Sequence, residues 1–240
     1  MQDRGKESLL KDSYAVVLLR PEHPENIGLV ARNMKNTGFE DLRLVGVSEL
    51  EEKSFVTAVH SRDILASAQF FSSLRAATAD CQVVFASTSK ARKNFPLLSL
   101  DDAVVKMSSY PRHTKIGLLF GNERTGLTSD ELRHSNFRFV IPQATDQPSY
   151  NLAAAVLLSL FRIFSCENSS CEVAAEKRPL SRHDQEECIR RILFILEEKR
   201  FYHAKNKKHV QEMIYDLFGR LALTEKDKSL LLAIFSKGTG

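Results

Sequence analysis

Short apolar runs alternate with segments of helical periodicity through the first two-thirds of the chain, and this alternation limits the possible folds more than any other feature. We expect five strands, each apolar over most of its length, at residues 14–19, 42–47, 82–86, 115–120 and 137–141. Strands that are apolar throughout are typical of parallel sheets buried on both faces. Because these strands alternate with helices, we predict an α/β fold with a mostly parallel sheet covered by helices.

Three helical segments carry end signals or an unusual apolar pattern. Residues 27–37 have helical apolar spacing and stop before Gly38, which we expect to be a left-handed C-cap. Thr128 and Glu131 have the spacing of a capping box and predict a short helix. Residues 151–165 are apolar on nearly every side, which predicts a helix that is buried or lies in a subunit interface.

The last third of the chain differs in composition from the rest. Residues 166–180 are polar and show no periodicity, so we expect a linker there. Three amphipathic helical patterns follow, at residues 181–200, 206–217 and 224–236. A chain of 240 residues has room for a medium-sized domain with an appendage. We therefore predict an α/β domain at residues 1–165, a linker at 166–180 and a small helical extension at 181–240.

Positive charge is concentrated in this extension. Residues 177–240 hold 14 Lys and Arg against 9 Asp and Glu, whereas the rest of the chain holds 20 against 21. Seven basic residues lie close together in sequence: Arg190, Arg191, Lys199, Arg200, Lys205, Lys207 and Lys208. A solvated helix face is one interpretation of the cluster, and contact with nucleic-acid phosphates is the other.

The cysteines, histidines and apolar segments exclude several classes of protein. The 4 cysteines form no Cys-x-x-Cys pair and the 7 histidines lack metal-ligand spacing, so we expect free thiols and no metal site. The first residues lack the apolar stretch of a signal peptide. The longest apolar region, at residues 152–164, is interrupted by Ser159 and Arg162 and is too short to span a bilayer. We predict a cytoplasmic protein with no membrane partner.

Three motifs follow predicted strands, where α/β proteins place their chemistry. The first leaves a strand at Arg20, turns through two prolines and enters a helix that we expect to begin near Glu25 or Asn26. Arg32 would then lie within the first two turns on the same face as Gly28, whose missing side chain would leave room for whatever Arg32 reaches. An N-capped helix with one surface arginine is the simpler interpretation of this motif alone.

The second motif spans residues 120–128, and Gly121 and Gly126 permit backbone conformations or close approaches that a Cβ would forbid. It suits a ligand lying against the main chain, although an ordinary glycine-rich turn has the same composition. Leu127 and Thr128 stand where a P-loop has Lys and Ser or Thr, which disfavours a P-loop nucleoside triphosphatase. The third motif spans residues 141–153 and places Ser149 and Asn151, both good N-cap residues, beyond the last strand. We expect the three loops to converge on one pocket.

Together and in this order, the motifs resemble the signature motifs of the SpoU/TrmH family of RNA 2′-O-methyltransferases in the SPOUT superfamily. The similar segments are Asn26-x-Gly28-x-x-x-Arg32-Asn33, Phe120-Gly-x-Glu123-x-x-Gly126-Leu, and Ile141-Pro through Ser149-x-Asn151-Leu-Ala. The likeness covers residues 14–165. The chain is also similar to the TrmJ-like branch at Ser87-Thr-Ser-Lys-Ala-Arg92 and at the Leu217-Phe-Gly-Arg220-Leu pattern of the extension.

The resemblance implies a SPOUT-type fold with a trefoil knot, a bound S-adenosylmethionine and a homodimer. It implies an enzyme that methylates the ribose 2′-hydroxyl of tRNA nucleotide 32, a cytidine or uridine that opens the anticodon loop. Two alternatives stay open. One is a SpoU-type enzyme acting on ribosomal RNA or at another tRNA site, and the other is a non-catalytic RNA-binding protein on the same fold.

The resemblance also assigns roles to residues of this chain. Cofactor binding falls to Ser87, Thr88, Ser89, Gly121, Ile141, Pro148, Ser149, Tyr150 and Asn151, of which Tyr150 replaces the family's usual Leu. Catalysis falls to Arg32 and Ser149, with Asn26 and Glu123 organising the site. For contact with RNA we expect Arg20, Arg32, Lys205, Lys207 and Lys208.

Arg32 matches a position to which the family assigns the catalytic base. A guanidinium with a pKa above about 12 is a poor base. We therefore expect Arg32 to bind the phosphate beside the target ribose and to stabilise the developing alkoxide, with Ser149 orienting the hydroxyl. The sequence leaves open whether the extension binds RNA or only supports the dimer.

Overall fold

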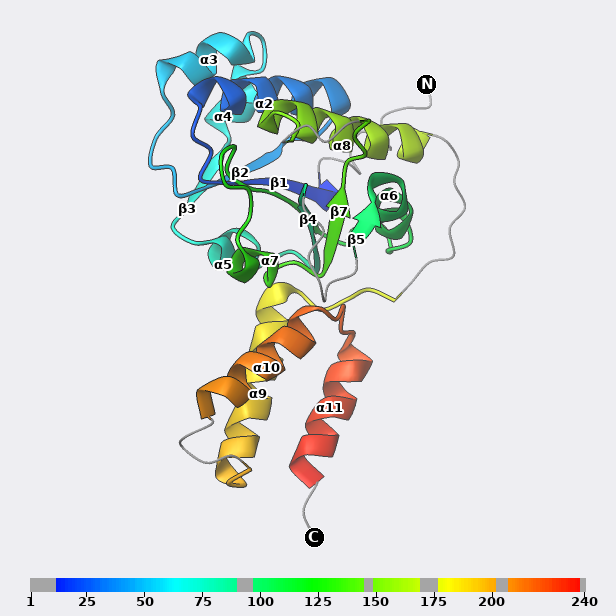
Figure 1. The fold of residues 1–240 in the computed structure, drawn as a ribbon. Coiled ribbons are helices and arrows are strands. Elements are labelled where there is room, and N and C mark those ends of the chain that lie inside the picture. Colours follow the sequence, from blue (N-terminus) through cyan, green and yellow to red (C-terminus); the bar gives the residue numbers. More distant parts are fainter. Residues whose placement is uncertain (1–11, 90–96, 145–148, 169–176, 202–206, 238–240) are drawn as a thin grey trace.

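The computed structural model describes residues 12–89, 97–144, 149–168, 177–201 and 207–237 (Figure 1). In this part of the chain seven parallel strands form one sheet in the order β3-β2-β1-β6-β4-β7-β5. The strands are β1 (Tyr14–Leu19), β2 (Asp41–Val45), β3 (Gln69–Phe71), β4 (Val83–Ser87), β5 (Leu97–Ser99), β6 (Ile116–Phe120) and β7 (Phe137–Val140).

Helices cover both faces of the sheet, as the predicted α/β fold requires. One face packs against α2 (Pro24–Thr37), α3 (Glu52–Ala58), α4 (Arg62–Ala66), α6 (Leu100–Ser108) and α8 (Leu152–Asn168), and the other against α5 (Leu74–Ala77) and α7 (Ser129–Leu132) (Figure 1). Successive residues of β1 point to opposite faces of the sheet: Val16 and Leu18 are buried under α2 and α8, while Ala15 and Val17 face α5 and α7. The sheet is therefore buried on both sides.

The five predicted strands are confirmed, with ends that differ by one or two residues. Gln82 lies just before β4 and Lys115 just before β6. The Gln82 backbone N–H donates to the Lys115 carbonyl oxygen, and the Lys115 backbone N–H donates to Gln82 Oε1. Two further strands, β3 and β5, were not predicted. Each has three residues, is partly exposed and lies at an edge of the sheet, so neither has the apolar run of a central strand.

The helix-end predictions are confirmed at Gly38 and Thr128. Gly38 has a φ of 81° and terminates α2, and Thr128 and Glu131 form the expected capping box. Gly28 has a different role from the one expected. A Cβ there would lie 2.1 Å from the Ser54 carbonyl oxygen and from Thr57 Oγ1, so glycine lets α2 pack closely against α3. It makes no space for Arg32.

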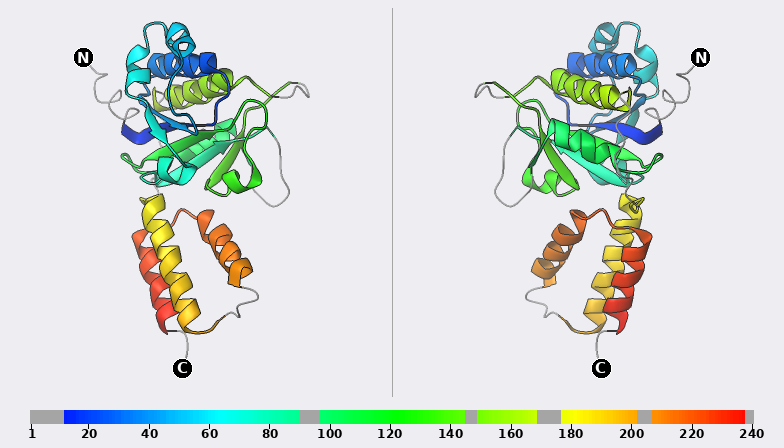
Figure 2. Two further views of the ribbon diagram at one scale, coloured as in Figure 1. Left: turned by 90° about the vertical axis from the view of Figure 1, so that its left-hand side faces the viewer. Right: turned by 90° about the vertical axis from the view of Figure 1, so that its right-hand side faces the viewer.

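The extension is a three-helix unit with its own apolar core. It consists of α9 (Arg182–Glu198), α10 (Lys207–Gly219) and α11 (Glu225–Lys237), and the first of these packs against the other two. Ile189, Ile192 and Leu196 of α9 are buried in this core. Figure 2 shows the three helices projecting from the side of the sheet that carries α5 and α7.

Buried polar contacts attach this extension to the α/β domain. The Arg182 backbone N–H donates to the Cys81 carbonyl oxygen over 2.7 Å, and its guanidinium donates to the His134 carbonyl oxygen at 3.0 Å. The same guanidinium bonds within the extension to the Gly219 carbonyl oxygen of α10 at 2.9 Å. Asn136 donates to the Leu221 carbonyl oxygen at 3.0 Å. The extension is thus docked at the loops before β4 and β7.

Helix α8 continues to Asn168, three residues into the predicted linker. The predicted domain boundaries and the predicted knot stay predictions.

Other expectations concern thiols, metals and membranes. Cys81, Cys166 and Cys188 are buried free thiols, as predicted, and Cys171 lies outside the described residues. Within the described ranges, no helix is long and apolar enough to cross a bilayer. The same ranges contain no group of three or more His, Cys, Asp and Glu side chains arranged to hold a metal ion.

Candidate functional site

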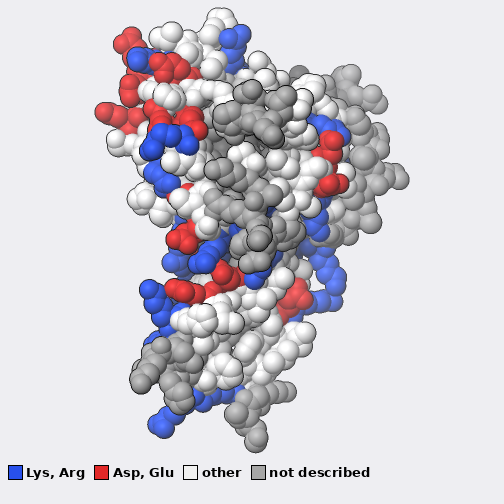
Figure 3. Space-filling view, in the orientation of Figure 1, with Lys and Arg blue, Asp and Glu red and all other residues white. Residues whose placement is uncertain are grey.

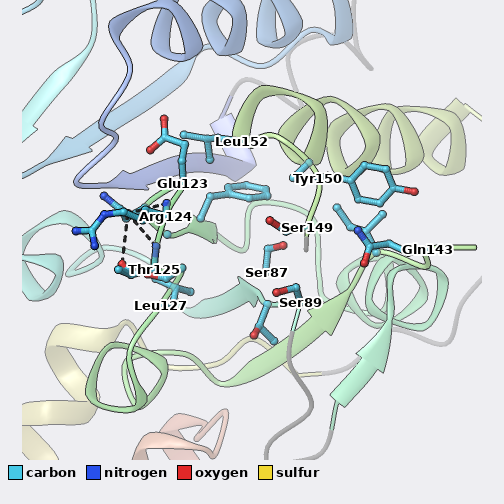
Figure 4. A pocket seen from close by; sticks show the side chains of 17 residues that line it. Ser87, Ser89, Glu123, Arg124, Thr125, Leu127, Gln143, Ser149, Tyr150 and Leu152 are labelled. Carbon is cyan, nitrogen blue, oxygen red and sulfur yellow. Dashed lines mark hydrogen bonds between the residues drawn. The ribbon is translucent and has the colours of Figure 1, made fainter. Parts of the chain in front are cut away.

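The second and third motifs and residues 87–89 form one pocket beyond the carboxyl ends of β4, β6 and β7. The first motif contributes no described residue to its wall and is joined to it through Asn26, which bonds to Glu123 and Asn151. The pocket encloses about 370 Å³, within the usual range for a small-molecule site. Figure 4 shows Ser87, Ser89 and Ser149 close together near its centre. The described residues of its wall are Ser87, Thr88, Ser89, Phe120, Gly121, Asn122, Glu123, Arg124, Thr125, Gly126, Leu127, Ile141, Gln143, Ser149, Tyr150, Leu152 and Ala155.

A chain of side-chain hydrogen bonds joins one residue from each motif. Asn151 Nδ2 donates to Asn26 Oδ1 over 3.0 Å, and Asn26 Nδ2 donates to Glu123 Oε1 over 2.8 Å. Asn151 also caps α8, because its Oδ1 accepts from the Ala153 backbone N–H at 2.9 Å. Asn26, the middle member of this chain, is buried, whereas Glu123 is partly exposed and Asn151 is exposed. Asn26 and Glu123 thus hold the three loops together, which fits the organising role expected of them.

Glu123 is the acceptor at the end of this chain. It also accepts from the backbone N–H groups of Glu22 at 2.8 Å and His23 at 3.3 Å, where β1 leads into α2. Burial alone raises the pKa of the Glu123 carboxyl, but the hydrogen bonds from Asn26, Glu22 and His23 outweigh it and hold the pKa below its ordinary value of 4.5. Glu123 is therefore an ionised structural acceptor near neutral pH.

The lowered pKa predicts how stability depends on pH. A carboxylate with a depressed pKa contributes stability above its unfolded-state pKa and loses that contribution as the pH falls through the folded value. Glu123→Gln should lower the melting temperature clearly at pH 7, and the difference from wild type should shrink below about pH 4. Glu52→Gln, an exposed carboxylate on α3, is the matched control. An equal difference at pH 3.5 and pH 7 would contradict the ionised-acceptor role.

Gly121 and Asn122 shape the loop that follows β6. A Cβ on Gly121 would lie 2.5 Å from the Gly126 carbonyl carbon and 2.7 Å from the Leu127 nitrogen, so the loop folds back on a bare backbone. Asn122 Oδ1 accepts from the backbone N–H groups of Arg124 at 2.9 Å and Thr125 at 3.1 Å. Its Nδ2 donates to the Arg20 carbonyl oxygen at 2.8 Å. Asn122 therefore fixes this loop and ties it to the first motif.

The structure places most of the predicted cofactor residues in the pocket wall. Those present are Ser87, Thr88, Ser89, Gly121, Ile141, Ser149 and Tyr150. Asn151 lies behind the wall in the hydrogen-bond chain, and Pro148 lies outside the described residues. The Tyr150 hydroxyl donates to the Pro142 carbonyl oxygen at 3.0 Å, which pins the loop after β7. Their roles toward a cofactor stay predictions.

Arg32 does not line the pocket of its own chain. Helix α2 begins at Pro24, earlier than expected, so Arg32 starts the third turn and is exposed. Among the described residues, none forms a hydrogen bond or an ion pair with its guanidinium. Ser149 does line the pocket, so the two predicted catalytic residues are not brought together by the fold of one chain.

The predicted RNA-binding residues lie in two places. Arg20 directly follows β1 with a φ of 50° and forms an ion pair with Glu131, so its guanidinium already has an anionic partner. On α10, Lys208 is exposed, and Lys207 pairs with Glu197 at 2.5 Å. Lys205 lies outside the described residues.

Sequence reasoning missed several residues of the wall. Asn122, Arg124 and Thr125 fall at positions that the second motif leaves variable, and Gln143 lies in the loop after β7. The signal available was their position directly beyond a buried strand, where a polar side chain faces the crevice.

Comparisons with known proteins agree with this geometry. The family described as the SpoU rRNA Methylase family matches residues 13–161. A relative from Methanocaldococcus jannaschii, named tRNA (cytidine-2′-O-)-methyltransferase TrmJ, is 31% identical over 216 residues, which cover 86% of this chain and 90% of the relative.

Two solved structures are also similar. The crystal structure of TrmJ from Z. mobilis ZM4 has a TM-score of 0.77 and 25% identity, and the match covers 92% of this chain and 97% of that one. The SpoU methyltransferase AviRb from Streptomyces viridochromogenes, in complex with AdoMet, has a TM-score of 0.54 and 22% identity over 70% of this chain and 66% of that one. The second comparison shows a shared fold.

Proposed function

The chain is a methyltransferase of the SpoU rRNA methylase family, and on that basis we propose that it transfers a methyl group from S-adenosylmethionine to a ribose 2′-hydroxyl of tRNA, at the pyrimidine of position 32. The observation that carries the proposal is the pocket built from the second and third motifs, to which the Asn151–Asn26–Glu123 hydrogen-bond chain ties the first motif. A tRNA substrate fits the predicted cytoplasmic location.

The likeness to TrmJ proteins supports tRNA as the substrate. The M. jannaschii relative is similar over 86% of this chain, and so the likeness extends from the α/β domain into the helical extension. Its name states a cytidine 2′-O-methyltransferase of tRNA. The choice of position 32 rests on the motif resemblance to the TrmJ-like branch, and ribosomal RNA is the alternative that the experiment below separates.

The pocket suits S-adenosylmethionine, which has a flat base, a ribose and a charged amino-acid end. The close approach of Gly121 to Gly126 and Leu127 leaves main-chain groups exposed in the wall, since no side chain covers them. Ser87, Thr88 and Ser89 add hydroxyl groups, while Ile141 and Leu152 add apolar surface. When bound, the cofactor supplies a methyl group on a positively charged sulfur.

The protein's own contribution is to position the ribose and to stabilise negative charge on its 2′-oxygen. Ser149 lies in the wall, where its hydroxyl can orient the 2′-hydroxyl. Arg32 would bind the adjacent phosphate through two parallel hydrogen bonds and so favour loss of the 2′-proton. Its high pKa makes it a binder of anions and a poor proton acceptor.

A homodimer would place Arg32 of one protomer at the pocket of the other. Arg32 is exposed on α2 and is not among the described residues that line the pocket. Helix α2 lies beside α8, to which Asn33 donates a 2.9 Å hydrogen bond at the Ala153 carbonyl oxygen (Figure 1). Helix α8 exposes Leu157 by 37% and Phe161 by 56%, an apolar surface next to Arg32's helix that a second copy can cover.

The direct test uses purified protein, methyl-labelled S-adenosylmethionine, unmodified tRNA transcripts and ribosomal RNA, with nucleoside analysis of each RNA. We expect label in tRNA as a 2′-O-methylated pyrimidine nucleoside. Label in ribosomal RNA alone would overturn the tRNA assignment. The non-catalytic alternative predicts no detectable heat when S-adenosylmethionine is titrated into the protein by calorimetry, whereas our proposal predicts saturable binding.

The extension is expected to hold RNA through its basic cluster. Figure 3 shows Lys and Arg side chains gathered around the junction of the two units and at the far end of the tail. Replacing Lys205, Lys207 and Lys208 together by Ala should weaken tRNA binding. The slope of log affinity against log salt should fall by about 0.7–0.9 for each phosphate that these lysines neutralise in the wild-type complex. Affinity for S-adenosylmethionine should not change.

The control for this triple variant is Lys53→Ala, Arg62→Ala and Arg112→Ala, which removes the same charge from exposed positions of the α/β domain. Equal RNA affinity and equal salt slope in both triple variants would mean that the extension is a structural element and takes no part in RNA binding.

A further inference from the structure

We propose that Arg124 binds a phosphate of the RNA at the mouth of the pocket, and that Glu22 occupies its guanidinium until RNA arrives. The inference rests on the proposed function and extends it by naming a substrate-binding pair within the chain that owns the pocket. Neither residue belongs to the motif positions to which the family resemblance assigns roles. The sequence pattern treats both as variable positions.

Arg124 is the only cation among the described residues of the pocket wall. Its side chain is 76% exposed, so it reaches beyond the wall into solvent. Figure 4 shows it beside Glu123, on the side of the pocket away from Gln143 and Tyr150. An RNA strand that brings a ribose to Ser149 carries phosphates on both sides of that ribose, and Arg124 is the positive group of the wall that can meet one of them.

The main chain of Arg124 is fixed while its side chain is loosely held. Its backbone N–H donates to Asn122 Oδ1 at 2.9 Å, and Asn122 is itself bonded to the Arg20 carbonyl oxygen at 2.8 Å. By contrast, Arg124 Nε meets Glu22 Oε1 only at 3.4 Å. Exposed ion pairs of this kind contribute little to stability, so a phosphate can replace the Glu22 carboxylate at low cost.

Glu22 is held at the place where the first two motifs meet. Its backbone N–H donates to Glu123 Oε2 at 2.8 Å, so the position of its Cα is set by the hydrogen-bond chain of the site. Its carboxylate, on a side chain that is 36% exposed, pairs with Arg124 and carries negative charge as a phosphate does. It therefore neutralises Arg124 in the free enzyme and repels an incoming phosphate until it moves aside.

The neighbouring cations are less suited to this role. Arg20 lies at the same edge of the sheet, but it pairs with Glu131, whose side chain is only 16% exposed and also accepts from the Thr128 backbone N–H at 2.8 Å. That pair is held by the capping box of α7. Arg32 does not line this pocket. A phosphate bound at the pocket mouth thus has Arg124 as its partner from the described part of this chain.

The experiment measures binding of an unmodified tRNA transcript and, separately, of S-adenosylmethionine. For Arg124→Ala we expect the dissociation constant for the transcript to rise about tenfold near 0.1 M salt, and the salt slope to fall by about 0.7–0.9, the value of one phosphate contact. Affinity for S-adenosylmethionine should be unchanged. Arg112→Ala, an exposed arginine on the loop between α6 and β6, is the charge-matched control and should leave both affinities unchanged.

A double-mutant cycle tests the role of Glu22. Glu22→Gln should tighten binding of the transcript about threefold in the wild-type background, because Arg124 is released and a repulsion is removed. In the Arg124→Ala background the same change should have little effect. An equal effect of Glu22→Gln in both backgrounds would overturn the pairing.

Two other results would also overturn the inference. One is an unchanged dissociation constant and salt slope in Arg124→Ala, and the other is a loss of S-adenosylmethionine affinity, which would assign Arg124 to the cofactor. These outcomes are distinct from failure of the proposed function. That failure would appear as absence of methyl transfer to tRNA by the wild-type protein, whatever Arg124 does to binding.

Discussion

Gly121→Ala is expected to weaken S-adenosylmethionine binding about 100-fold. The added Cβ would lie 2.5 Å from the Gly126 carbonyl carbon and 2.7 Å from the Leu127 nitrogen, both main-chain atoms that cannot rotate away. The loop after β6 must therefore open, and a backbone displacement of this kind costs about 3 kcal/mol, which corresponds to about two orders of magnitude in affinity. Isothermal calorimetry with the cofactor measures the effect.

Gly126→Ala is the matched control for this prediction. Nothing lies within 4 Å of a Cβ at Gly126, so the only cost is the φ of 64°, about 1 kcal/mol for a residue with a side chain. This variant should lose only about fivefold in affinity. A thermal melt of each variant separates loss of folding from loss of the site. Equal cofactor affinity for folded Gly121→Ala and wild type would show that the loop after β6 does not form the cofactor site.

Arg32→Ala is expected to lower kcat about 100-fold or more while leaving the affinity for S-adenosylmethionine unchanged. Arg32 is not among the described residues of the pocket wall, and we propose that it binds the reacting RNA, so its loss should spare the cofactor. Removing one preorganised group that stabilises charge in a transition state typically costs about 100-fold to 1000-fold in rate. Single-turnover methylation of a tRNA transcript, with cofactor binding measured in parallel, gives the two quantities.

Arg32→Lys distinguishes a phosphate clamp from a simple positive charge. Lysine keeps the charge but lacks the planar fork that makes two parallel hydrogen bonds, so we expect it to restore only a small part of the lost rate. The control is Arg112→Lys, at an exposed position remote from the site. Full turnover by Arg32→Lys would rule out the bidentate clamp.

Mixed dimers test whether Arg32 acts across a subunit interface. Arg32→Ala and Ser149→Ala should each be nearly inactive alone. If Arg32 of one protomer serves the pocket of the other, a mixed dimer of the two variants contains one complete site. An equal mixture, in which half of the dimers are mixed, should then recover about a quarter of wild-type activity. No recovery, with mixed dimers shown to form, would place Arg32 at the pocket of its own chain.

The central strands could be predicted because burial on both faces demands continuous apolar runs. The run Tyr14–Leu19 is buried at every position, and the sequence shows that directly. The edge strands β3 and β5 have three residues each and are partly exposed, so neither their length nor their polarity separates them from loops. Pairing with a neighbour, which the sequence does not display, is what makes them strands.

The site divides in a similar way. That three loops converge beyond the strand ends follows from parallel topology, and the pocket wall contains residues of the second and third motifs. The pairing of Asn26 with Glu123 and Asn151 could not be predicted from spacing, since these residues are about 100 positions apart and meet only in the folded sheet.

Two residues show how local patterns mislead. Gly28 follows the motif spacing toward Arg32, yet its small size is required by Ser54 and Thr57 of the neighbouring helix α3. Arg32 itself looks like a residue of the pocket when its helix is considered alone, but it faces outward in the folded chain. Long-range packing determines what Gly28 does and which way Arg32 faces, and it is not visible in a local window.

The most direct test of the account is to map ribose methylation at nucleotide resolution in an unmodified tRNA transcript incubated with the protein and S-adenosylmethionine. We expect one new 2′-O-methyl group, at the pyrimidine of position 32, and none in a transcript that carries a 2′-deoxyribose at that position. Methylation of a base, methylation of the deoxyribose-containing transcript at position 32, or a tRNA left unmodified under conditions where ribosomal RNA is methylated would contradict it.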